Sequence, residues 1–90
     1  NNIFNRLISA YVRFEVLDKP GILSNITNIF SKNQVSIKRL IQDPNKEKKS
    51  SSIIIITHET KDECLRKIIK ETSKKKYIKK QPKLIRIDGN

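Results

Sequence analysis

The sequence predicts an α+β domain in which two helices cover one face of a four-stranded antiparallel sheet. Three observations support this fold class. The stretch from Ala10 to Leu17 alternates apolar and charged residues, the period of a strand with one buried face. Two later stretches repeat apolar residues at helical spacing. Four consecutive isoleucines at 53–56 form a run that is too short and too β-branched for a helix.

The first strand, Ala10–Leu17, is expected to end at a corner with the sequence Asp18-Lys19-Pro20-Gly21. Proline does not extend a central strand, but its fixed φ suits the first turn of a helix, and aspartate is a common capping residue. A helix should therefore begin at this corner. Its apolar residues share one helical face and are Ile22, Leu23, Ile26, Ile29 and Phe30.

The first helix should end at Lys32, because Asn33 tolerates a left-handed backbone. Alternation then resumes and predicts a second strand over Val35–Gln42, with a bulge at Leu40–Ile41 where the alternation slips. Composition predicts a turn at residues 43–46 and a polar loop at residues 47–51.

The isoleucine run predicts a third, central strand over Ser52–Thr57 with both faces largely covered. Thr60 and Glu63 have the spacing of a capping box, in which Thr60 would be the N-cap of a second helix ending near Ser73. The apolar positions of this helix are Cys64, Leu65, Ile68 and Ile69.

The last strand is predicted from Tyr77–Ile78 and Leu84–Ile87, and Pro82 between them argues for a sheet edge or a strand start. The resulting β-α-β-β-α-β order is the ferredoxin-like arrangement. We expect this domain to span residues 10–88. Residues 1–9 carry apolar residues at helical spacing and are expected to be a linker or the end of a preceding domain.

Composition restricts the class of protein. Ninety residues allow one small core, and a chain without methionine is expected to be a segment of a longer polypeptide. The single cysteine excludes an internal disulfide and a multi-thiolate zinc site. The longest apolar run is far shorter than the roughly 20 residues of a membrane span. These features predict a soluble, cytoplasmic protein.

The net charge of +11 raises the question of nucleic acid, because basic domains attract phosphate backbones. The lysines are scattered along every segment, however, and lysine, isoleucine and asparagine all have AT-rich codons. We attribute the charge to base composition and expect no nucleic-acid partner. The sharpest run, Lys74–Lys76, is typical of a solvated surface.

The sequence contains no arrangement of residues expected to catalyse a reaction or bind a metal. His58 is the only histidine and has no second ligand at metal spacing, so it is expected at the surface at the end of a strand. Cys64 lies on an apolar helical face, which predicts a buried thiol. With only Gly21 and Gly89, the chain has no glycine-rich phosphate loop.

Taken with this order of elements, the corner Asp18-Lys19-Pro20-Gly21-Ile22-Leu23 resembles that of an ACT domain, a small allosteric module that binds amino acids. The resemblance covers Ala10 to Asp88 and includes Val35-Ser36-Ile37 followed by Leu40-Ile41-Gln42. Tyr11-Val12-Arg13-Phe14 and Pro82-Lys83-Leu84-Ile85-Arg86-Ile87 are similar to the C-terminal regulatory part of homoserine dehydrogenases.

This resemblance implies a non-catalytic fragment of a homoserine dehydrogenase, with NAD(P) bound elsewhere in the parent and threonine as feedback inhibitor. It also implies a homodimer in which two sheets join side by side. The competing parent is a synthetase and hydrolase of guanosine tetraphosphate, whose ACT domain has a similar corner. The alternative function is RNA binding, for which Tyr11 is the only good stacking residue on the first strand.

The corner supplies partners for both charged groups of an amino acid. The first turn of a helix has unpaired amides and a positive dipole end, so the amides of Gly21, Ile22 and Leu23 are expected to hold a carboxylate. Pro20 starts this helix. Asp18 either accepts a hydrogen bond from the ligand ammonium or caps the helix.

Two amide side chains complete the predicted ligand-binding set. Asn25 lies one turn along the helix from Gly21, where it either reaches the ligand or is solvated. Gln42, at the end of the second strand, resembles a ligand-contacting glutamine of threonine-sensing relatives. It is expected to meet a ligand at the corner of a dimer partner.

Overall fold

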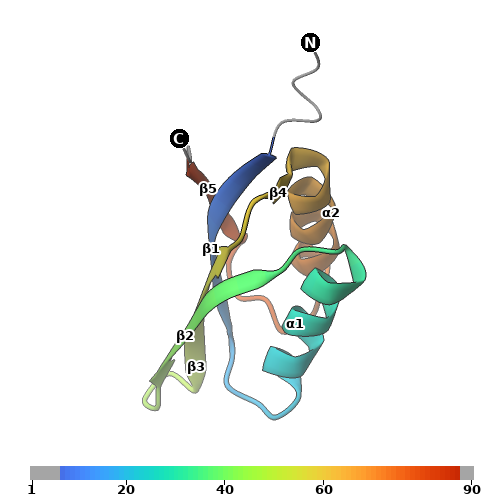
Figure 1. Cartoon of the computed structure of the whole chain (residues 1–90). Coiled ribbons are helices and arrows are strands. Elements are labelled where there is room, and N and C mark those ends of the chain that lie inside the picture. Colours follow the sequence, from blue (N-terminus) through green and yellow to red (C-terminus); the bar gives the residue numbers. More distant parts are fainter. Residues whose placement is uncertain (1–6, 88–90) are drawn as a thin grey trace.

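A computed structural model describes residues 7–87 and shows the expected α+β fold (Figure 1). The elements are β1 (Leu7–Leu17), α1 (Ile22–Lys32), β2 (Ile37–Asn45), β3 (Ser50–Thr57), β4 (Thr60–Lys61), α2 (Asp62–Ser73) and β5 (Lys83–Ile87). The strand order is β2-β3-β1, and β1 also pairs with β4 and with β5; all these pairings are antiparallel. The two-residue β4 is the one strand that the sequence analysis did not predict.

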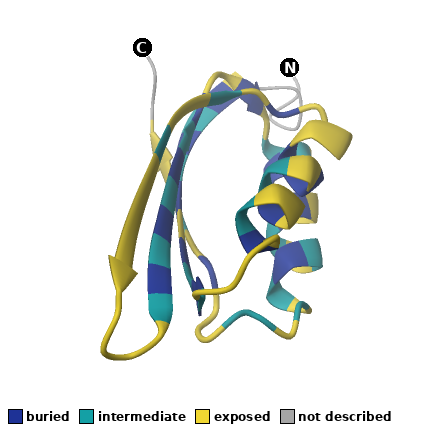
Figure 2. Ribbon diagram, turned by 90° about the horizontal axis from the view of Figure 1, so that it is seen from below, coloured by how far each residue is buried: buried dark blue, intermediate teal, exposed yellow. Residues whose placement is uncertain are grey.

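Both helices cover the same face of the sheet, and the core lies between them and the strands (Figure 2). In β1 every second residue from Ile8 to Val16 is buried, which confirms the predicted alternation. The Phe14 ring of β1 meets the Phe30 ring of α1 edge to face, with 6.1 Å between ring centres. This pair joins the first helix to the centre of the sheet.

β1 begins three residues earlier than predicted. Residues 7–9 belong to this strand and not to the expected linker, because Leu7 and Ile8 pair with β4, and Ser9 pairs with Ile87 of β5. The helical spacing of the apolar residues was misleading because Ile8 continues the buried face of the strand. The remainder of the predicted linker, residues 1–6, lies outside the described residues.

The hairpin between β2 and β3 also differs from the prediction. β2 starts at Ile37 and continues through Asp43 and Pro44, which were expected to form a turn. Pro44 is accommodated because β2 is an edge strand, where a missing N–H costs no ladder hydrogen bond on the open side. The turn lies at residues 46–49, and the bulge lies between Ile37 and Arg39 rather than at Leu40–Ile41.

β3 has one buried face, not two. Ile53 and Ile55 are buried under the helices, whereas Ile54 and Ile56 on the opposite face are half-buried. The prediction of two covered faces was wrong because no helix of residues 7–87 covers the second face. That face of the sheet is open (Figure 2).

The predicted capping box does not form. Lys61 is the N-cap of α2, without a side-chain capping bond, and Thr60 lies in β4, where it is buried opposite Ile8. Sheet pairing therefore takes Thr60 away from the helix. The helix start is instead stabilised by the acidic residues Asp62 and Glu63 of its first turn.

Asp62 links the start of α2 to β5. Its carboxylate accepts hydrogen bonds from Arg86 of β5 at 2.6 Å and from Arg66, one helical turn along, at 2.8 Å. These bonds and the nearby charges lower the Asp62 pKa, and the Arg86 hydrogen bond contributes most. The ion pairs therefore help to hold β5 beside α2.

We expect acid to weaken this contact. Since the Asp62 pKa is lower in the folded chain than its ordinary value of 3.8, the ion pairs stabilise the fold above that value. The stabilisation is lost as the pH falls through the lowered, folded-state pKa. Asp62→Asn should be less stable than the native chain at neutral pH and should lose less further stability on acidification, measured by urea denaturation. Equal losses on acidification in both chains would contradict this assignment.

Candidate functional site

The corner between β1 and α1 is shaped by Gly21. Gly21 is the N-cap of α1 and has a left-handed backbone with φ 88°, a conformation that strongly favours glycine. Its carbonyl accepts the first helical hydrogen bond, from the Asn25 amide at 3.0 Å. No side chain caps this helix start in the described chain. The next amides of the first turn thus lack a side-chain partner, as an anion site requires.

Asp18 does not cap the helix. Its backbone N–H donates to the Lys49 carbonyl at 3.0 Å, and its side chain is exposed at the corner. The predicted capping role of Asp18 is therefore wrong. The bond to Lys49 also brings the turn between β2 and β3 against the corner.

A small pocket of about 190 Å³ opens at this corner. Gln42 of β2 pairs with Ile53 of β3, and Ile53 faces the helices, so the Gln42 side chain is on the same face as the start of α1. The pocket is lined by Val16, Leu17, Asp18, Lys19, Pro20, Gly21, Ile22, Leu23, Gln42, Ser51 and Ile53. Six of the seven predicted ligand-binding residues therefore meet in one place, within a single chain.

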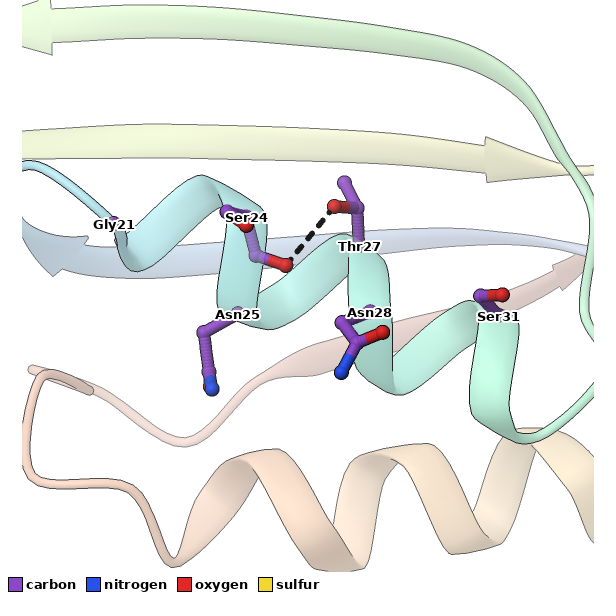
Figure 3. A pocket seen from close by; sticks show the side chains of 6 residues that line it. All are labelled: Gly21, Ser24, Asn25, Thr27, Asn28 and Ser31. Atoms are coloured by element: carbon purple, nitrogen blue, oxygen red, sulfur yellow. Dashed lines mark hydrogen bonds between the residues drawn. The ribbon is translucent and has the colours of Figure 1, made fainter.

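Asn25 is the exception. It lies with Gly21, Ser24, Thr27, Asn28 and Ser31 around an open depression on α1 (Figure 3), and of these residues Gly21 alone also lines the corner pocket. Its side-chain oxygen accepts a hydrogen bond from the Tyr77 hydroxyl at 2.5 Å. The amide of Asn25 thus connects α1 to the segment that follows α2.

That segment, residues 74–82, forms a strap along the end of β1. The Tyr77 carbonyl accepts from the Leu17 amide at 3.0 Å, and the Lys79 amide donates to the Glu15 carbonyl at 2.8 Å. Tyr77 and Ile78 therefore belong to the strap and not to the last strand, as the sequence had suggested. Burial, followed by the charge of Glu71, raises the pKa of the Tyr77 hydroxyl, so it remains a hydrogen-bond donor at neutral pH.

Sequence reasoning missed several pocket residues, Ser51 among them, and it missed Tyr77 of the strap. Ser51 is buried and belongs to β3, not to the expected polar loop. It continues the alternate set of Ile53, Ile55 and Thr57, so the period of the strand was a detectable signal. Tyr77 carried no comparable signal, because its hydrogen bond to Asn25 spans 52 positions of sequence.

The other residues considered for chemistry lie apart from the corner. His58 is exposed after β3, and Cys64 is partly buried against the core, less completely than expected. Among residues 7–87, no group of three histidine, cysteine, aspartate or glutamate side chains is close enough to hold a metal ion. No helix in the same part of the chain is long and apolar enough to cross a membrane.

Comparison with known proteins agrees with this fold and corner. The model of the ACT domain family matches residues 10–75, so the chain belongs to the ACT domain family. Its curated relatives include the homoserine dehydrogenases of Methylobacillus glycogenes, 41% identical over 56% of this chain, and of Bacillus subtilis, 28% identical over 89%. The matches cover 12% and 19% of those proteins, so the chain spans a fifth or less of their length.

Solved structures show the same fold. A homoserine dehydrogenase from Thiobacillus denitrificans superposes with a TM-score of 0.82 at 24% identity, over 98% of this chain and 19% of that one. The ACT domain from the GTP pyrophosphokinase of Chlorobium tepidum gives a TM-score of 0.70 at 16% identity, over 91% of this chain and all of that one. The chain is thus an ACT domain related to homoserine dehydrogenases.

Proposed function

We propose that this chain is the amino-acid-binding regulatory domain of a homoserine dehydrogenase and that threonine is its ligand. The observation that carries the proposal is the corner pocket, where an uncapped helix start, a carboxylate and a glutamine amide meet. The kinship with homoserine dehydrogenases supports the choice of parent. In that parent, NAD(P) would bind outside this domain.

The pocket offers a partner for each part of threonine. The helix-start amides after Gly21 would hold the carboxylate, and Asp18 would accept from the ammonium. Gln42 would bond to the side-chain hydroxyl, and Val16, Leu23 and Ile53 would contact the methyl group. At about 190 Å³ the pocket is smaller than the roughly 300–1,000 Å³ typical of drug-sized ligands, as suits a small amino acid.

Regulation requires that the ligand favour one arrangement of the protein over another. β2 pairs with β3 alone within residues 7–87, so its outer edge is available for a second sheet. Beside that edge lies a depression lined by Thr27, Ser31 and residues 34–37, with room for a partner's side chains. We propose side-by-side homodimerisation at this edge. Gln42 lies on the same strand, β2, and would contact the ligand of its own chain.

Titration with L-threonine, followed by amide NMR, tests the proposal. The expected result is a saturable shift of the amides from Gly21 to Ser24 and of the Gln42 side chain. D-threonine and L-lysine serve as controls, since neither presents the same carboxylate, ammonium and hydroxyl arrangement. The proposed function fails if no proteinogenic amino acid shifts these signals.

Gln42→Leu is expected to weaken threonine binding about fivefold, because one hydrogen bond of about 1 kcal/mol is lost while the side-chain size is kept. Calorimetric titration measures the change. Gln81→Leu is the matched control, because Gln81 is exposed in the strap and does not line the pocket. Equal affinities of the two variants would exclude Gln42 as a ligand contact.

The alternatives make different predictions. An ACT domain from a guanosine tetraphosphate synthetase would lie in a parent without a nicotinamide-binding domain, so the sequence of the parent distinguishes it. An RNA-binding domain would bind single-stranded RNA at moderate salt through stacked bases. Tyr11 is the one aromatic residue on the open face of the described sheet, where isoleucines occupy the neighbouring positions. This face therefore favours an apolar contact over base stacking.

A further inference from the structure

The open face of the sheet has an apolar centre. Residues paired across an antiparallel sheet lie on the same face, so the register lists the side chains opposite the helices. One row contains Arg39, Ile56, Tyr11 and Ile85, and the next contains Ile41, Ile54, Arg13 and Lys83. Four isoleucines and a tyrosine thus lie in two adjacent rows. We call these five residues, with Ile87 beside them on β5, the apolar patch.

This patch has no partner in the described chain. Ile41, Ile85 and Ile87 are 44%, 46% and 40% exposed, and with Leu7 at 54% they are all the exposed large hydrophobic residues of positions 7–87. All four are on the open face. A sheet covered on one side ordinarily has polar residues on the other side. Concentration of every such residue on one face therefore indicates a contact surface.

The charges around the patch are mixed, unlike those of the whole chain. In the rows from Ser9 to Glu15 the face carries three cations, Arg13, Arg39 and Lys83, and two carboxylates, Glu15 and Asp43, for a net charge of +1. The whole chain has a net charge of +11. Arg13 is also neutralised by Glu15, whose carboxylate is 2.7 Å away. This face therefore carries only a small part of the net positive charge that would make two copies repel each other.

We propose that the apolar patch binds a second copy of this chain, face to face, as two sheets of a sandwich. A twofold arrangement presents the same patch from both copies, so isoleucines meet isoleucines and the mixed charges can pair around them. This contact is separate from edge pairing at β2, because it uses the surface of the sheet and not its hydrogen-bonding edge. Together the two contacts would build a tetramer.

Sedimentation velocity of the whole chain, from micromolar to millimolar concentration, tests this proposal. Association is expected to strengthen with added salt, because salt screens the repulsion between two strongly basic copies. The variant with Ile41→Thr and Ile85→Thr should associate at least about tenfold more weakly, since each lost apolar contact occurs twice in the interface. Threonine is well tolerated in exposed strands, so the fold should persist, as circular dichroism will show.

Lys67→Thr is the matched control, because Lys67 is exposed on α2 and lies far from the open face. A second measurement localises the contact. The chain has two tyrosines and no tryptophan, so Tyr77→Phe leaves Tyr11 in the patch as the sole strong fluorophore. Its quenching by acrylamide should decrease as concentration rises. A chain that stays monomeric, equal association of the double variant and the control, or unchanged Tyr11 quenching would each overturn the proposal.

Discussion

Phe30→Ala is expected to lower the free energy of unfolding by about 3–5 kcal/mol, the usual cost of removing a buried phenylalanine. Phe30 is completely buried on α1 and meets Phe14 edge to face at 6.1 Å. Its removal leaves a cavity between the first helix and the sheet. Since a small domain is stable by only about 5–15 kcal/mol, this loss is a large part of the total.

Urea denaturation followed by circular dichroism measures the change, with Phe30→Leu as the control. Leucine keeps most of the volume, so the control should lose clearly less stability. α1 also carries the helix-start amides of the corner, and the alanine variant should therefore bind threonine less tightly as well. If the two variants are equally stable, the contact between Phe30 and Phe14 does not hold α1 in place.

Thr57→Val is expected to lower the free energy of unfolding by about 1–3 kcal/mol, although the substitution only replaces a hydroxyl by a methyl group of nearly the same size. The Thr57 hydroxyl is buried and accepts a hydrogen bond from the Ala10 amide at 3.0 Å. Ala10 lies between Ile8, the last residue of β1 that pairs with β4, and Tyr11, the first that pairs with β3. Valine would leave this buried amide without its partner.

Thr72→Val is a close control. Thr72 is equally buried, but its hydroxyl donates to the Ile68 carbonyl one helical turn back. That carbonyl already accepts a backbone hydrogen bond within the helix, so removing the hydroxyl leaves no buried group unpaired. The free energy of unfolding should therefore change little. Hydrogen exchange should show faster opening at Ala10 in Thr57→Val only. Equal destabilisation of the two variants would contradict a special role for Thr57.

Most of the fold was predictable because its signals are local. The alternation from Val12 to Val16 and the helical period of Ile22, Ile26 and Ile29 each lie within one element. The element boundaries were less accurate where a partner strand decided them. Pro44 was expected in a turn and lies in a strand, and Thr60 was expected to cap a helix and pairs with Ile8 instead.

The candidate site was partly predictable for the same reason. Asp18, Pro20, Gly21, Ile22 and Leu23 are contiguous, so the corner could be recognised without knowing the tertiary structure. Asn25 had a local argument too, but Tyr77 occupies its amide oxygen, and Tyr77 arrives from beyond the second helix. No pattern in the sequence links those two residues.

The sequence by itself determined the order of the main elements, the buried face of each helix and the position of the corner between β1 and α1. These features depend on the spacing of apolar residues, on the fixed φ of Pro20 and on the left-handed φ that Gly21 can adopt. Only the tertiary structure decided that Gln42 meets the corner of its own chain and that the isoleucines of β3 have one open side. Both outcomes depend on strand register and on which face the helices cover, and these are set by contacts between residues far apart in sequence.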